Sequence, residues 1–63
     1  MTKDERIAMI DAQLKVYEQQ IFKFEMNKTA ILANDDIEGG KDIDKRIEAL
    51  RKAYKAVEGM KEV

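Results

Sequence analysis

Apolar residues recur at alternating spacings of three and four along two segments of this chain, and this pattern constrains its fold more than any other feature. Such spacing keeps the apolar side chains on one face of a helix, as in helices that pack side by side in coiled coils. The chain has 63 residues and no proline, so both segments can form uninterrupted helices. The first stripe comprises Ile7, Ile10, Leu14, Tyr17, Ile21, Phe24, Lys28 and Ile31, and the second comprises Ile43, Ile47, Leu50, Tyr54 and Val57.

Capping signals predict where the first helix begins. Thr2 is followed three residues later by Glu5, which is the spacing of a capping box. The hydroxyl of Thr2 can accept a free amide hydrogen of the first turn, and the Glu5 carboxylate can reach back to the cap. We therefore expect the first helix over about residues 3–33.

A polar break separates the two stripes. Gly39 and Gly40 are unfavourable inside a helix, so we expect a glycine-containing acidic turn over about residues 34–42. Asp42 is then the expected N-cap of a second helix over about residues 43–60. A break this short favours an antiparallel arrangement. The prediction is a single all-α domain over residues 1–63, a two-helix antiparallel hairpin with a long first helix and a shorter second one.

The unequal lengths of the two helices predict self-association. A second helix that starts near residue 43 leaves Ile7, Ile10 and Leu14 uncovered, and exposing three such side chains forgoes several kcal/mol, at about 25 cal/mol per Å² of apolar surface. A second copy would cover them, most simply in a homodimeric four-helix bundle with coiled-coil-like packing, although exchange of helices between chains fits the stripes almost as well. The predicted self-association residues are Ile7, Ile10, Leu14, Tyr17, Ile21, Phe24, Ile47, Leu50, Tyr54 and Val57.

The first helix also carries apolar residues away from its stripe. Met9, Val16, Phe22 and Met26 lie on the other side of the helix, and a helix that is apolar on two sides is usually buried on two sides. One interpretation is that these residues widen the core of the hairpin. The other is that they form a face for a different protein, for which flexible methionine side chains are well suited.

The composition leaves little room for catalysis. The chain contains no cysteine, histidine or serine, so the usual nucleophiles and zinc, haem or iron–sulfur ligand sets are missing. The acidic turn follows a helix–loop–helix calcium pattern at Asn34, Asp36 and Gly39, but Lys45 stands where a bidentate glutamate is required. We expect no enzyme activity, no cofactor and no metal site.

The charge pattern gives an alternative function. The formal net charge is −1, so the chain as a whole does not attract nucleic acid or anionic membranes. The second helix nevertheless has a basic outer side, and a dimer of hairpins would duplicate it along a nucleic-acid backbone. Interspersed glutamates and the lack of aromatic residues favour a solvated helix face instead. This basic ridge comprises Lys41, Lys45, Arg51, Lys52 and Lys55.

These patterns together predict a small non-enzymatic protein–protein interaction module. It associates with itself and acts as an adaptor or inhibitor that docks on a larger protein through helix faces. The alternatives are nucleic-acid binding through the basic ridge and a structural role as a subunit of a larger helical assembly. We expect no signal peptide, no membrane contact and a cytoplasmic location, and compact chains of this style are common among regulators of phages and other mobile elements.

Overall fold

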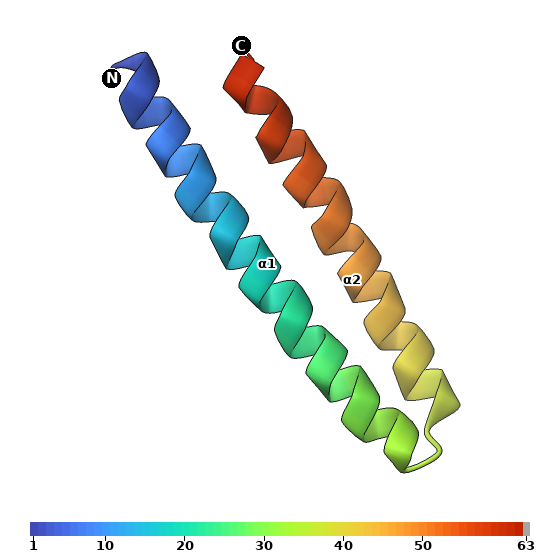
Figure 1. Cartoon of the computed structure of the whole chain (residues 1–63). Helices are drawn as coiled ribbons and strands as arrows, with labels where there is room; N and C mark the ends of the chain where they lie inside the picture. The colour runs from blue at the N-terminus through green and yellow to red at the C-terminus, as the bar shows by residue number, and fades with distance from the viewer. Residues whose placement is uncertain (63) are drawn as a thin grey trace.

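The structure, a computed structural model, describes residues 1–62 and is an all-helical antiparallel hairpin. Helix α1 spans Lys3–Ala33, helix α2 spans Ile37–Glu58, and a short 3-10 helix, η1, continues α2 over Gly59–Glu62. The two long helices lie side by side, with both chain termini at the same end of a rod about 50 Å long (Figure 1). The predicted all-α, two-helix hairpin is confirmed.

The start of α1 follows the capping signal at Thr2. The amide of Glu5 donates a hydrogen bond to the Thr2 hydroxyl oxygen at 3.1 Å, as expected for a helix N-cap. The Thr2 hydroxyl in turn donates to the Glu5 carboxylate at 3.0 Å. The carboxylate thus meets the hydroxyl of the cap residue, whereas a standard capping box pairs it with the cap amide. Asp4 and Glu5 also place negative charge at the positive end of the helix dipole.

The connection between the helices is much shorter than the sequence suggested. Asp35 adopts the left-handed conformation, with φ of 61°, and its amide donates to the carbonyl of Leu32 at 3.0 Å. The amide of Asp36 donates to the carbonyl of Ile31 at 3.3 Å, which completes a Schellman ending of α1. Three residues, Asn34 to Asp36, are therefore enough to reverse the chain.

The predicted start of the second helix near Ile43 is wrong, because α2 begins at Ile37. Its N-cap is Asp36, whose carboxylate accepts a hydrogen bond from the Gly39 amide at 2.9 Å. Asp42, the expected cap, lies inside the helix. The sequence therefore contained the right kind of capping residue, but the glycine pair directed the prediction to a later one.

The two glycines lie in the first turns of α2, where there is little room for a side chain. Gly40 is buried, and a Cβ at that position would lie 2.8 Å from Cδ2 of Leu32 on α1. A side chain at Gly39 would collide with the capping carboxylate of Asp36. The glycines cost helix propensity, about 1 kcal/mol each relative to alanine, but they allow the tight turn.

The early start of α2 removes the predicted overhang of α1. Together α2 and η1 run alongside almost all of α1, and η1 brings Met60 and Lys61 beside its N-terminal turns. Ile10 and Leu14 are buried and Ile7 is half-buried. The prediction that these three side chains project uncovered is wrong, and self-association cannot rest on it.

The seam between the helices forms a thin core. Ile21, Ile43 and Ile47 form its central buried cluster, flanked by half-buried residues from both helices. Leu14 is the most deeply buried large side chain, and it keeps 4% of its surface exposed. A two-helix unit buries each helix on one side only, so the domain is expected to be marginally stable by itself.

The position of the α2 cap gives a direct test of this turn. We predict that Asp36→Ala lowers the free energy of unfolding by about 1 kcal/mol, because the Gly39 amide loses its acceptor. Asp42→Ala removes the same chemical group from the helix interior and is the matched control, with little expected change. Thermal unfolding by circular dichroism at one protein concentration compares the two. Equal losses, or a larger loss for Asp42→Ala, would contradict the observed start of α2.

Candidate functional site

One edge of the hairpin is joined by polar bridges between the helices. Lys28 and Asp44 form an ion pair at 2.7 Å, and Arg51 and Glu25 form another at 3.3 Å. Two further bridges lie nearer the chain termini. We call this edge the charged edge, and its bridging pairs are Lys28–Asp44, Glu25–Arg51, Glu18–Tyr54 and Asp11–Lys61.

The heptad spacing places these bridges in a line. Asp11, Glu18 and Glu25 are seven residues apart, so they recur at the same angle around α1 as it follows the seam. Their partners are Lys61 in η1 and Tyr54 and Arg51 in α2, which are seven and then three residues apart. The acidic row of α1 was readable in the sequence as a seven-residue repeat, but we did not predict the edge that it forms. Each pair has at least one solvent-exposed member, so each contributes at most about 1 kcal/mol and the main effect of the pairs is on register.

Two of the bridges alter the protonation of their members. The Tyr54 hydroxyl donates to the Glu18 carboxylate at 3.1 Å, and this hydrogen bond raises the pKa of Tyr54 above its ordinary value. The bridge to Asp11 raises the pKa of Lys61 in the same way, because it stabilises the ammonium form. In both cases the protonated form is the one that makes the bridge.

The outer face of α1, directed away from α2, is unusually apolar for a solvated surface. Met9, Val16, Phe22 and Met26 expose 61%, 42%, 59% and 50% of their surfaces. The interpretation that these residues widen the core of the hairpin is therefore wrong. We use the term outer face for these four residues together with the exposed alanines Ala8, Ala12, Ala30 and Ala33.

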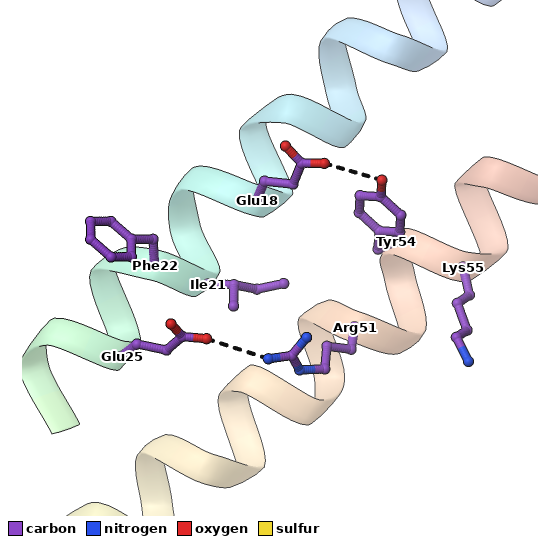
Figure 2. A pocket seen from close by; sticks show the side chains of 7 residues that line it. All are labelled: Glu18, Ile21, Phe22, Glu25, Arg51, Tyr54 and Lys55. Atoms are coloured by element: carbon purple, nitrogen blue, oxygen red, sulfur yellow. Dashed lines mark hydrogen bonds and ion pairs between the residues drawn. The ribbon is translucent and has the colours of Figure 1, made fainter. Parts of the chain in front are cut away.

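The four large residues of the outer face do not form one narrow stripe. With about 100° of rotation per residue, Met26 lies next to Phe22, whereas Met9 and Val16 lie roughly a third of the circumference away from Phe22. Phe22 borders the charged edge, beside a hollow of about 390 Å³ (Figure 2). This hollow is lined by Glu18, Ile21, Phe22, Glu25, Arg51, Tyr54 and Lys55.

The hollow combines an apolar base with charged walls. Ile21 points into the seam between the helices, Tyr54 and Arg51 approach from α2, and each is bridged to a glutamate of α1 (Figure 2). The hollow is open to solvent. An arrangement of this kind can receive a side chain from a partner surface.

The predicted self-association residues lie at the seam within one chain. Ile10, Leu14, Ile21 and Ile47 are buried there, and the other residues of the set are half-buried between α1 and α2. The hairpin thus uses these side chains for its own folding. Contact of their remaining exposed surface with a second copy of the chain stays a prediction.

The basic ridge is partly neutralised by neighbouring acids. Lys41 pairs with Glu38 at 3.8 Å, Lys52 pairs with Glu48 at 3.6 Å, and Arg51 is bridged to α1. Lys45 and Lys55 form no ion pair with any residue in the described part of the chain. Nucleic-acid binding through this ridge stays an alternative.

Two further features bear on the class of protein. Between residues 1 and 62, no three acidic side chains come together in a group able to hold a metal ion. Over the same residues, neither helix has a stretch long and apolar enough to cross a membrane.

Comparisons with protein-family models, with curated proteins and with solved structures found no match for this chain. Its candidate site is therefore defined by the geometry of its own residues.

The bridge at Tyr54 predicts a titration that can be measured separately. In a Tyr17→Phe background Tyr54 is the single tyrosine, and its ionisation can be followed by ultraviolet absorbance. We expect its pKa to lie above the ordinary value of 10.0, and Glu18→Gln to lower it, since the hydrogen bond to Glu18 is the main cause of the shift.

The same shift fixes the direction of a pH effect on stability. A raised pKa in the folded chain means that the Tyr54 bridge stabilises the fold below pH 10 and that this contribution is lost as the pH rises through the folded pKa. An unchanged Tyr54 titration in Glu18→Gln would contradict the bridge.

Proposed function

We propose that this chain is a small non-enzymatic interaction module that associates with itself and docks on a larger protein through the outer face of α1. In this role it acts as an adaptor or an inhibitor. The docking side centres on Phe22 and Met26, which neighbour each other on the helix surface. The proposal needs no cofactor and no metal.

The observation that carries this proposal is the contrast between the outer sides of the two helices. The outer side of α2 is rich in charge, as expected for a helix that faces water. The outer face of α1 instead exposes four large apolar side chains and four alanines, interrupted mainly by Lys15, Gln19 and Lys23. Large exposed apolar side chains that neighbour each other, as Phe22 and Met26 do, are typical of a protein-binding site.

The shape of this face favours a helical or flat apolar partner. Alanines allow the backbone of another helix to approach closely, and Phe22 and Met26 can act as anchors. Fully burying one large apolar side chain contributes about 1.5–3 kcal/mol, so two anchors account for about 3–6 kcal/mol before the costs of association. Methionine side chains adapt to irregular partner surfaces.

The ion pairs of the basic ridge argue for this function over nucleic-acid binding. Three of the five cations have an acidic neighbour, so a phosphate backbone would have to displace existing pairs. A structural subunit of a larger assembly would consume the same apolar face with identical copies. It differs from the proposal in growing beyond a dimer as concentration rises.

Photo-crosslinking tests the proposal. We expect a photoreactive phenylalanine analogue at position 22 to crosslink a discrete larger protein in the host cell, and the same analogue at Lys45 not to do so. The purified partner should then bind Phe22→Asp and Met26→Asp at least tenfold more weakly, since loss of one anchor costs more than about 1.4 kcal/mol.

A matched control separates the outer face from general effects of added charge. Ala49→Asp places the same carboxylate on the exposed side of α2 and should leave partner binding unchanged. If Phe22→Asp bound the partner as the unmodified chain does, the proposal would fail. If Lys45→Glu with Lys52→Glu abolished function and the complex weakened steeply with salt, nucleic-acid binding would replace it.

A further inference from the structure

The edge of the hairpin opposite the charged edge carries no polar bridge. On α1 it is marked by Gln13, Gln20 and Asn27, which are again seven residues apart, and on α2 by Arg46 and Ala53. In the part of the chain that the structure describes, no side-chain hydrogen bond or ion pair joins the two helices here. We call it the amide edge, and these five residues define it.

The half-buried seam residues differ between the two edges. On the charged edge Lys28, Tyr54 and Lys61 each end in a polar group that reaches a carboxylate. On the amide edge the half-buried seam positions are almost entirely hydrocarbon. They are Tyr17, Phe24, Ile31, Leu50 and Val57.

These apolar positions are continuous with the established core. Phe24, Ile31 and Leu50 pack against the buried cluster on one side and remain partly open on the other. A hollow of about 320 Å³ opens on this edge beside Phe24 and Asn27, and Asp42 and Arg46 of α2 also line it. The core therefore ends at the amide edge with apolar surface uncovered, where a further layer of helices would complete it.

The chemistry of the amide edge suits a second copy of the same chain. A symmetric interface brings a surface against itself, so a row of like charges would repel its own copy. Side-chain amides both donate and accept hydrogen bonds, so a row of them can pair with an identical row. Arg46 is the single charged residue among the five, so the edge has no row of like charge, and an unlike partner would not require this absence.

We propose that two copies of the chain pair through their amide edges and form a four-helix bundle whose shared core includes Phe24, Ile31, Leu50 and Val57. This inference rests on the self-association in the proposed function and assigns it to one surface. The charged edges then lie on the outside of the bundle, where their bridges remain solvated.

In this arrangement one part of the outer face of α1 contacts the second copy and the other part remains free for docking. Met9 and Val16 lie on the side of α1 nearer to the amide edge, so the second copy would partly cover them. Phe22 borders the charged edge and would remain accessible, with Met26 beside it. A dimer of this kind presents its docking site twice and can bind two partners or one partner at two points.

Two isosteric variants on adjacent residues test the assignment. Gln20→Glu adds a negative charge to the amide edge, and Gln19→Glu adds the same charge to the outer side of α1. Both residues are exposed, so each variant should still fold as a hairpin. We expect light scattering over a range of concentrations to give the unmodified chain a molar mass of twice 7.3 kDa, that of a dimer. We expect the dimer dissociation constant to rise about tenfold or more for Gln20→Glu and little for Gln19→Glu, because only the first places a carboxylate in the interface, where it loses contact with water.

The possible outcomes separate the two proposals. A chain that is monomeric at every concentration would overturn the self-association itself. A dimer that survives Gln20→Glu and Ala53→Glu but dissociates with Met26→Glu would overturn the amide edge while leaving self-association intact. Partner crosslinking at position 22 that persists in monomeric Gln20→Glu would show that docking and pairing use different surfaces, as proposed.

Discussion

The packing of α1 against α2 along a single seam determines the role of every other surface of this chain. A helix pair can bury only one side of each helix, and here that side is specified by the alternating three- and four-residue spacing. The close turn at Asp36 sets the register, because it starts α2 early enough to cover the N-terminal turns of α1. The two edges and two outer sides that remain outside the seam then differ sharply in chemistry.

These surfaces differ in charge and apolarity more than the surfaces of a simple solvated hairpin would need to. One edge carries bridges from carboxylates of α1, which stabilise the antiparallel register and leave no free row of like charge. The other edge has three side-chain amides and a single charged residue, Arg46, among the five residues that define it, and it is partly apolar. The outer side of α2 is charged, whereas that of α1 is apolar around Phe22 and Met26. A chain with so thin a core stabilises itself weakly, so association is expected to contribute to its stability.

Much of the fold was predictable from sequence, since the stripes identified the seam residues and the Thr2 cap located the start of α1. The start of α2 was not predictable from propensity, because Gly39 and Gly40 act as breakers unless tertiary contact requires small residues. Here Gly40 lies close to Leu32, Gly39 lies close to the carboxylate of Asp36, and Asp36 supplies the cap. The exposure of Phe22 and Met26 also needed the structure, because a sequence pattern cannot show whether a second apolar side is covered by the same chain.

Isotope-filtered NMR of a mixture of labelled and unlabelled chains tests the central claim most directly. We expect nuclear Overhauser contacts within one chain between Met60 and the side chains of Ile7 and Ile10, because η1 lies beside the first turns of α1. Absence of these contacts would mean that the N-terminal turns of α1 are uncovered. Contacts that arise only between chains would mean that the helices are exchanged in an assembly and that the hairpin is not the folded unit.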